Sequence, residues 1–446
     1  NGEISIDNTY LDWASFYQTI NICNTILKFA PTAQANDPTF SEAQLKEYEG
    51  QAIAIRSLMY FYLVRTFGDV PFIREAYVNG SQQMSVAKSS EKEILAGLVA
   101  DLEMVETGNY LPGQYSSTDI AQNKGRMTMW AVKALLADIY LWQEEYEKCN
   151  RKCDEIIGSG QLLLVPVESR KIEVENTEEG TTDIYYAPDQ SSYYSLFQQI
   201  YYQGNSMESI FELQFATDNL NPFYSLMSSG RGVIGVKTER VNSDIFPPLA
   251  DEAYSGECFD IRSVISQSKS CLWKYIGVEP NGSERAQEEY TNNFIIYRLA
   301  EIYLMKAEAL TQMAILDSDN QELLKEAYAA VKVIRDRSTA VATTDIGQTE
   351  GSYSGKAMEE FVLAERGREL IFEGKRWFDV LRQAKRNNYD GENLNYLMTL
   401  AEYSAPASKV NSLKAKYRNY HSHYLPIYSE EIDANPLLEQ NEFYAN

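Results

Sequence analysis

The sequence predicts a mainly α-helical protein, in which helix pairs of tetratricopeptide type form a scaffold and a long, loop-rich insert holds small β elements. Three observations predict it: helical spacing of apolar residues towards both ends, a hexapeptide that occurs twice, and short β-prone runs between them. We expect a single domain over residues 1–446 with four parts: an N-terminal helical scaffold (10–158), the insert (159–292), C-terminal helix pairs (293–386) and an irregular segment (387–446).

Two long helices are predicted first. Tyr10–Phe29 carries apolar residues at helical spacing and is expected to end before Pro31. Ser41 and Gln44 form a capping-box pattern that begins a second helix, which we expect to end at Gly68. Steps of four and three residues along this helix predict one buried stripe, made of Tyr48, Ala52, Ile55, Met59 and Tyr62.

Three further helices complete the N-terminal scaffold. Ser90 and Glu93 repeat the capping-box pattern and begin a helix that runs to about Val105. A fourth helix is predicted over Thr128–Trp142, and a fifth over Tyr146–Ile157, where Gly residues follow.

The insert and the C-terminal part differ in their periodicity. In the insert, β-prone runs lie between turn residues and predict strands at Leu162–Val167, Ile210–Phe215 and Val233–Val236. The helical period then returns and predicts helices at Phe294–Met313, Asn320–Arg337 and Met358–Phe372, the last continuing to about Ala384. From about Tyr417 the sequence is irregular, with a short run at Tyr424–Tyr428.

One internal repeat supports the helix pairs. Leu136–Leu141 (LADIYL) recurs as Leu299–Leu304 (LAEIYL), and a break and a second amphipathic helix follow each copy. Small Ala and large Tyr positions allow paired helices to pack closely, as in tetratricopeptide units. We therefore expect Ala137 and Ala300 to lie where two helices approach each other.

Composition and charge exclude several classes of function. With 64 acidic and 40 basic residues the formal charge is −24, which would repel phosphate backbones and anionic lipid. Neither nucleic acid nor a bare anionic bilayer is an expected partner. The chain has no apolar run of the roughly 18 residues that a membrane-spanning helix needs.

Metal and histidine chemistry also lack support in the sequence. Cys149 and Cys153 are four residues apart on a predicted helix, but no second Cys or His pair lies nearby, so we expect two small core residues. His421 and His423 are the only histidines, which leaves no convincing His-based triad or zinc site. No metal and no cofactor is expected.

Several segments, in order along the chain, resemble the SusD/RagB family, the surface nutrient-binding lipoproteins of Bacteroidetes. They include Asp12–Asn24, Arg56–Pro71, Ser209–Glu212, Tyr297–Ala309, Glu365–Arg382, Leu425–Ile427 and Asn435–Asn441. The resemblance implies a SusD-like fold and a non-enzymatic protein at the outer-membrane surface. Such a protein captures oligosaccharides and delivers them to a SusC-type TonB-dependent transporter. Because peptide capture also occurs in the family, a RagB-like peptide-binding protein is the alternative.

Membrane association is expected only through a lipid anchor, which the resemblance places ahead of the first helix. Cys23 falls within a predicted helix and follows Ile20-Asn21-Ile22, which is not the small-residue run that lipidation needs. The anchor is therefore expected on a segment absent from this chain. Because the segment ahead of the first helix contributes to the ligand surface in sugar-binding relatives, we expect part of that surface to be absent here as well.

Carboxylate pairs raise a glycosidase as a third hypothesis. Glycoside hydrolysis uses two carboxyl groups about 5 to 9 Å apart, and Glu301 with Glu308, and Glu365 with Glu369, would each lie along one helix face. Because Arg366 and Arg368 are interleaved with the second pair, and Glu373 lies three residues before Arg376, we predict a structural ion-pair network instead. No phosphate-binding loop is predicted either, since the glycines that flank Arg231 are typical of an exposed turn.

Aromatic residues of the insert are the predicted ligand contacts. Six tyrosines fall between Tyr185 and Tyr202, and exposed rings suit the C–H faces of sugars while a Tyr hydroxyl can bind a polar partner. The alternative is that one ring of each Tyr doublet packs beneath the insert, and Trp273 is as compatible with the core as with a site. The predicted ligand-binding residues are Tyr193, Tyr194, Tyr202, Tyr224, Arg231 and Trp273.

Overall fold

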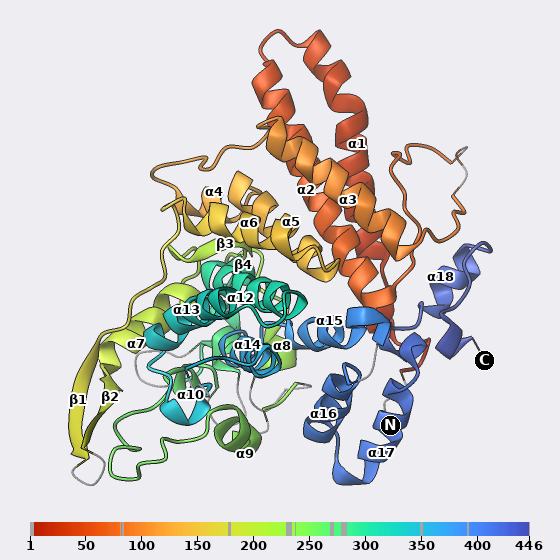
Figure 1. Ribbon diagram of the computed structural model, residues 1–446. Helices are drawn as coiled ribbons and strands as arrows, with labels where there is room; N and C mark the ends of the chain where they lie inside the picture. Colours follow the sequence, from red (N-terminus) through yellow and green to blue (C-terminus); the bar gives the residue numbers. More distant parts are fainter. Residues whose placement is uncertain are drawn as a thin grey trace. The chain divides into compact units, whose positions relative to one another are not determined.

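The structure is a computed structural model that describes residues 4–80, 82, 84–176, 180–228, 234–236, 238–267, 272–277, 283–347, 351–389 and 392–445. Helices make up most of it, with two small antiparallel sheets (Figure 1). The predicted mainly α-helical class with small β elements is confirmed. Contacts within the chain divide it into two compact units, 1–113 with 127–144 and 377–446 (the first unit), and 114–126 with 145–376 (the second unit).

The first unit is built on a helical hairpin. α1 and α2 pack against each other, α3 packs against α2, and α5 packs against α3. No helix of the described residues has the length and apolar character needed to cross a membrane. The helices of this unit are α1 (Ala14–Asn36), α2 (Glu42–Phe67), α3 (Glu91–Thr107), α5 (Met129–Trp142), α15 (Arg376–Tyr389, which begins at the last residue of the second unit), α16 (Asn395–Ser404), α17 (Val410–Tyr417) and α18 (Ser429–Ala434).

The caps of α2 agree with prediction, but its buried face does not. The Ser41 side chain accepts from the Gln44 amide and the Gln44 side chain accepts from the Ser41 amide, which completes the capping box. The predicted stripe is wrong except at Ala52, which is buried. Tyr48 is exposed, and Ile55, Met59 and Tyr62 lie on the least buried side, because α1, α3 and α5 all contact this helix and cover its other faces.

Two further expectations for the first unit are corrected. α1 continues through Pro31 to Asn36. Proline breaks a helix by a missing N–H bond and a clash, yet here it lies near the exposed end, where the loss is tolerated. The C-terminal stretch expected to be irregular contains α16, α17 and α18, short helices whose few buried residues leave only a weak periodic signal.

The second unit has a helical core and two β pairs. α12 packs against α6, α13 and α14, and a buried cluster of mostly small and aliphatic residues fills the space around α12–α14. Its elements are α4 (Ile120–Lys124), α6 (Tyr146–Ile157), β1 (Ser169–Asn176), β2 (Thr181–Pro188), α7 (Gln190–Phe197), the π-helical turn η2 (Gln198–Tyr202), β3 (Ser209–Leu213), α8 (Tyr224–Met227), α9 (Thr238–Arg240), α10 (Arg262–Ile265), α11 (Trp273–Ile276), β4 (Phe294–Arg298), α12 (Leu299–Leu316), α13 (Gln321–Arg337) and α14 (Gly355–Glu369).

The repeated alanines and paired cysteines are buried as predicted. Ala137 of α5 and Ala300 of α12 have no exposed surface, and Ala300 belongs to the cluster between α12, α13 and α14. Cys149 and Cys153 are both buried on α6, which confirms that they are core residues. The two copies of the repeated hexapeptide lie on α5 and α12, and the helices that follow them are placed differently. α13 packs on α12 within the second unit, whereas α5 belongs to the first unit and the helix that follows it, α6, to the second.

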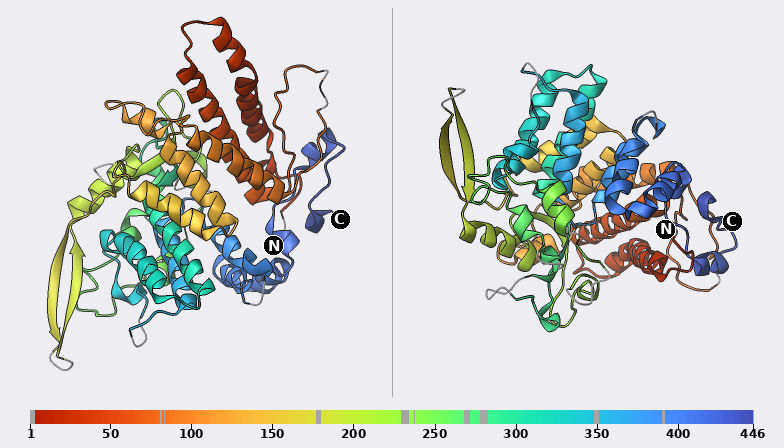
Figure 2. Two further views of the ribbon diagram at one scale, coloured as in Figure 1. Left: turned by 45° about the horizontal axis from the view of Figure 1, so that its top comes forward. Right: turned by 90° about the horizontal axis from the view of Figure 1, so that it is seen from below.

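The strands of the insert follow the prediction only in part. Ile210–Phe215 corresponds to β3, but its partner β4 occupies Phe294–Arg298, where a helix start was expected. Adjacent β-branched residues, Ile295 and Ile296, favour that strand. Leu162–Val167 forms no strand, and Val233–Val236 forms none over its described residues 234–236. The β1–β2 hairpin was not predicted; it extends away from the helices of its own unit (Figure 2).

Candidate functional site

An open hollow lies in the loop between α2 and α3 of the first unit. Its volume is about 360 Å³. It is lined by Phe72, Ile73, Arg74, Glu75, Tyr77 and Gln82, and we call it the loop hollow. This lining combines aromatic rings with a guanidinium, a carboxylate and an amide, which is a set of groups suited to a polar ligand with apolar faces.

Local sequence explains how the loop leaves and rejoins the helices. α2 ends at Gly68, whose φ of +76° is a conformation that side-chain-bearing residues rarely adopt. The two ends of the loop then meet, because the Ser89 amide donates to the Val70 carbonyl at 2.9 Å. Ser90 caps α3 directly afterwards. The residues between are thus held as a closed loop on the helical scaffold.

Side chains of α1 and α2 fix the loop backbone. The Tyr60 hydroxyl accepts from the Ile73 amide (2.7 Å) and donates to the Ile73 carbonyl (2.8 Å). The Asn24 amide group donates to the carbonyls of Ile73 and Glu75 at 3.1 and 3.2 Å. Asn21 makes a matched pair of bonds with the backbone N–H and C=O of Tyr77, at 2.7 and 3.1 Å. These bonds satisfy backbone groups of Ile73, Glu75 and Tyr77 and hold this irregular segment on the two helices.

A chain of charges runs from the helix core to the loop hollow. Asp101 of α3 accepts from buried Arg56 at 2.8 Å and from Arg74 of the loop at 2.6 Å. Arg56 also donates to Asn24 at 2.8 Å, which connects this ion pair to the backbone contacts. The Arg74 side chain stays 43% exposed while Asp101 is 11% exposed, so the chain of charges ends at the surface.

The two aromatic rings of the hollow differ in their support. Phe72 packs edge-on against Tyr60, with ring centroids 5.0 Å apart. Its ring also lies over Gly97 of α3, where an added Cβ would come within 2.9 Å. Tyr77 is half-buried, and burial raises the pKa of its hydroxyl, an effect that the neighbouring Glu75 charge increases. The Tyr77 hydroxyl is therefore neutral at physiological pH and can donate to a ligand.

The sequence-predicted ligand residues lie in the second unit and pack more deeply. Tyr193 is only 8% exposed and stacks on half-buried Tyr194, both on α7, with ring centroids 5.3 Å apart. Tyr202, in η2, is covered by the Arg285 guanidinium, which lies 3.5 Å from the ring centroid and donates to the Tyr202 carbonyl. These rings belong to one hydrophobic cluster beneath the insert.

The remaining predicted residues belong to an adjoining cluster. Tyr224 of α8 packs against Tyr290 with centroids 5.3 Å apart. Trp273 of α11 contacts both clusters and is half-buried. Arg231 lies outside the described residues. The structure thus gathers the five described residues into two clusters that share Trp273, with their rings partly covered by protein.

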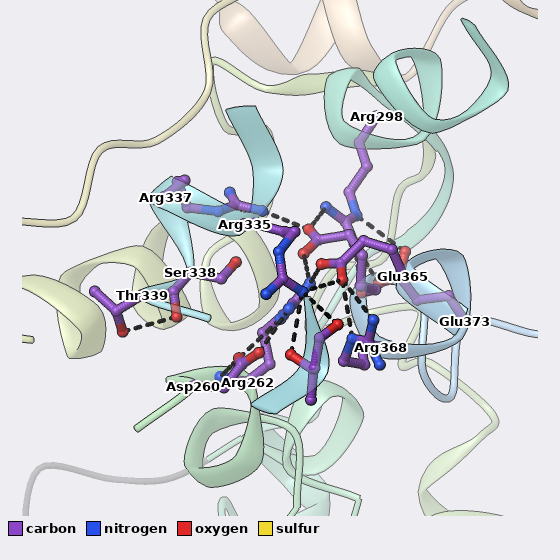
Figure 3. A network of polar contacts seen from close by, with 12 residues as sticks. Asp260, Arg262, Arg298, Arg335, Arg337, Ser338, Thr339, Glu365, Arg368 and Glu373 are labelled. Carbon is purple, nitrogen blue, oxygen red and sulfur yellow. Dashed lines mark hydrogen bonds and ion pairs between the residues drawn. The ribbon is translucent and has the colours of Figure 1, made fainter. Parts of the chain in front are cut away.

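Of the two carboxylate pairs that raised the glycosidase hypothesis, Glu365 and Glu369 belong to a buried ion-pair network, part of which Figure 3 shows. Glu301 and Glu308 pair with Arg366, at 3.4 and 3.7 Å. Glu365 accepts from Arg262 (2.7 Å) and Arg335 (3.1 Å). Glu369 pairs with Arg298 at 2.6 Å and also with Arg262 and Arg337. The prediction of a structural network is confirmed for this pair. The network continues through Glu208, Asp260, Lys274, Arg368 and Glu373.

Electrostatics keep these carboxylates ionised. Burial alone would raise the pKa of Glu365, but the charges of Arg262, Arg368 and Arg335 outweigh it and lower the pKa to about 2. Arg298 and Lys274 lower the pKa of Glu373 to about 2 against the same effect of burial. Such groups cannot act as general acids near neutral pH. No cluster of three or more His, Cys, Asp or Glu side chains suited to a metal occurs in the described residues.

Comparisons with known proteins identify the family. Residues 266–444 match the model of the SusD family, and residues 2–141 match a model described as starch-binding associating with outer membrane. The SusD-like protein P38 of Formosa agariphila is 23% identical over 458 aligned positions, covering 98% of this chain and 80% of its own. The chain belongs to the SusD/RagB family.

Solved structures agree with this SusD/RagB assignment. A SusD-like protein from Bacteroides fragilis superposes with a TM-score of 0.69 at 19% identity, covering 99% of this chain and 88% of that one. Surface glycan-binding protein A from Bacteroides uniformis superposes with a TM-score of 0.67 at 22% identity, covering 99% and 87%. At these identities the likeness concerns the fold.

Sequence patterns of this SusD/RagB protein do not point to the loop hollow. Phe72, Arg74 and Tyr77 are spaced irregularly, so neither the helical nor the strand period singles them out. One signal is present in the sequence. The segment between Gly68 and Ser90 has no helical or strand period, which indicates a loop between two helices, and loops held by a rigid scaffold often carry function.

Proposed function

We propose that this protein is a non-enzymatic cell-surface glycan-binding protein, which captures oligosaccharides and delivers them to a SusC-type TonB-dependent transporter. The observation that carries the proposal is the loop hollow, where rings and hydrogen-bonding groups meet on a fixed backbone. Support also comes from the matched family model, described as starch-binding associating with outer membrane, and from the fold shared with surface glycan-binding protein A of Bacteroides uniformis.

The mechanism follows from the groups in the hollow. Sugar rings present C–H faces that pack on Phe72 and Tyr77, while their hydroxyls bind Arg74, Glu75 and Gln82. With few groups and open access, affinity is modest, which suits cargo that must be released to a transporter. A lipid anchor ahead of the first helix would hold the protein at the outer membrane, as in the family that the chain resembles.

Binding without turnover is favoured by the state of the carboxylates. Those of the buried network are ionised and paired, so they supply neither the acid nor the free nucleophile that glycosidases need. Incubation with labelled oligosaccharides tests this point, and we expect no shorter products.

Isothermal titration against a panel of plant and host glycans, followed by variants, tests glycan capture. Phe72→Ala and Tyr77→Ala should each weaken binding by about 1–2 kcal/mol, since each removes one stacked ring. Ala33→Leu, at an exposed position of α1, is the control and should leave affinity unchanged. Failure of every glycan to bind, or full affinity in both ring variants, would contradict the proposed site.

Peptide capture is the second candidate, and one observation favours it. β1 and β2 form a sheet of two strands, so each strand has one edge that the sheet does not pair. An extended peptide could add to such an edge through main-chain bonds. Mass spectrometry of material that co-purifies with the protein separates the two candidates, because bound peptide and bound glycan differ in composition.

A further inference from the structure

The two rings of the loop hollow are held in place by different means. Phe72 is held by ring contacts, since it packs edge-on against Tyr60 and lies over Gly97. Within the described part of the chain, the Tyr77 side chain makes no ring contact and no hydrogen bond. The place of the Tyr77 ring in the hollow therefore depends on the backbone from which the ring projects.

Two amide side chains hold that backbone. Asn21 of α1 accepts from the Tyr77 amide at 2.7 Å and donates to the Tyr77 carbonyl at 3.1 Å. Gln82 donates to the Ala76 carbonyl at 3.0 Å and accepts from the Val78 amide at 2.7 Å. Residues 76–78 are thus bonded through both backbone groups of Tyr77 and through one group of each neighbour.

The Gln82 amide serves mainly the loop, although Gln82 also lines the hollow. Its Oε1 accepts a second bond, from the Asn79 amide at 3.3 Å. Its Nε2 uses one hydrogen on Ala76, and since a primary amide carries two such hydrogens, the other is left for a ligand. Most of the hydrogen-bonding capacity of Gln82 is therefore spent on the backbone around Tyr77.

A backbone that is fixed beforehand favours binding. An irregular surface segment samples many conformations unless its backbone groups are bonded, and ordering it when a ligand binds would consume part of the interaction free energy. The bonds from Asn21 and Gln82 fix residues 76–78 before a ligand arrives. A sugar that packs on Tyr77 then meets a ring that is already in place.

We propose that Gln82, together with Asn21, is a positioning residue for ligand capture. It holds the backbone around Tyr77 so that the ring can stack on a sugar, and it raises affinity through that ring. The inference rests on the proposed function and adds the residues that make the Tyr77 side of the hollow rigid.

A double-mutant cycle between Gln82→Met and Tyr77→Ala, measured by isothermal titration, tests the inference. Methionine keeps the length of glutamine and removes its hydrogen bonds. The probe is the glycan of the panel that binds most tightly, with maltohexaose, chitohexaose and xylohexaose as reference members. We expect Gln82→Met to weaken binding at least fivefold in the original protein and less than twofold in the Tyr77→Ala background, where the ring through which Gln82 acts is gone.

Two results of this cycle would overturn the inference and leave the proposed function standing. Equal losses in both backgrounds would show that Gln82 acts on the ligand by its own contact. Full affinity in Gln82→Met would show that Tyr77 needs no such support. Failure of the whole panel to bind would instead remove the proposed function, and this inference with it.

Hydrogen exchange of the free protein shows whether the change stays local. Gln82→Met should speed exchange of the Val78 amide at least tenfold, while the Ile73 amide and the melting temperature stay unchanged. Gln122→Met is the matched control, because Gln122 is exposed on α4 of the second unit and likewise donates from its side chain, to Asp119 at 2.9 Å. It should alter neither affinity nor exchange in the loop. A Val78 amide that exchanges as before in Gln82→Met would contradict the positioning role.

Discussion

The two units use the same chemistry, arginine with carboxylate, for different ends. In the second unit Glu365 and Glu369 meet arginines from several elements and are sealed from solvent (Figure 3). In the first unit the chain from Arg56 through Asp101 ends at Arg74, which remains partly exposed beside a hollow. A closed network holds elements together, whereas an open-ended one places a polar group where a ligand can reach it.

The comparison also separates two kinds of aromatic residue. Rings of the insert pack into clusters, so removing one ring should lower the stability of the protein as well as any affinity for a ligand. Phe72 and Tyr77 line an open hollow on a loop that other residues fix. The following predictions run from the largest expected effect to the smallest.

Breaking the closed network should have the largest effect. Glu369→Ala leaves the buried guanidiniums of Arg262, Arg298 and Arg337 without a shared partner, which we expect to cost about 3–5 kcal/mol in the free energy of unfolding. Arg74→Ala, in the open network, should cost less than about 1 kcal/mol because the side chain is partly exposed. Urea denaturation measures both, and equal losses would show that the two networks do not differ in this way.

The units should also differ in their response to pH. Burial lowers the pKa of His423, in the first unit, from 6.5 to about 4. Between these two pH values the His423 side chain is protonated in the unfolded chain but not in the folded protein. The free energy of unfolding therefore falls by up to about 3 kcal/mol as pH falls from 6.5 to 4. In the second unit Glu365 and Glu373 have pKa values lowered from 4.5 to about 2, so their contribution is lost only as pH falls from 4.5 towards 2.

These two pH ranges are measured by following the free energy of unfolding from pH 7 to pH 2 with a probe in each unit. His423→Asn should remove the loss between pH 6.5 and 4, while His421→Asn, at a more exposed position, should keep it. Identical pH dependence in both variants and in the original protein would contradict the role given to His423.

Core packing around α12 predicts a smaller effect. Ala300→Leu adds volume to the closely packed cluster between α12, α13 and α14, and should cost about 1–3 kcal/mol. Ala33→Leu on the exposed surface of α1 is the matched control and should change the melting temperature little. An unchanged melting temperature in the first variant would show that the repeated hexapeptide is not a packing repeat.

The smallest expected effect concerns ligand contacts in the insert. We predict that at least two of six single alanine variants in the insert weaken ligand binding by about 1 kcal/mol or more without unfolding the protein. Titration of each variant, with its melting temperature measured alongside, shows whether affinity and stability separate. Affinity that responds only at Phe72 and Tyr77 would assign recognition to the loop hollow alone. The variants replace Tyr193, Tyr194, Tyr202, Tyr224, Arg231 and Trp273 one at a time.

Local signals in the sequence predicted the positions of helices more accurately than they predicted buried faces or ligand sites. The capping box of α2, the Ser90 cap of α3 and the helix over Tyr146–Ile157 agree with the structure, because caps and short-range periodicity depend on neighbouring residues. The buried face of α2 and the strand at Phe294–Arg298 depend on partners distant in sequence, which periodicity does not contain. The loop hollow escaped prediction for the same reason, since Asn21, Asn24 and Tyr60 shape it from other elements.

The double hydrogen bond between Tyr60 and Ile73 has a consequence for hydrogen exchange. An amide in an irregular surface loop normally exchanges quickly with solvent deuterium, because small local openings expose it. The Ile73 amide is instead bonded to a hydroxyl of α2, and the Tyr77 amide to a side chain of α1. Exchange of each amide then requires the loop to leave the helix that holds it, so both should exchange at rates typical of helices. The amides of their loop neighbours Val78 and Asn79 bond instead to the Gln82 side chain within the same loop, and they should exchange faster.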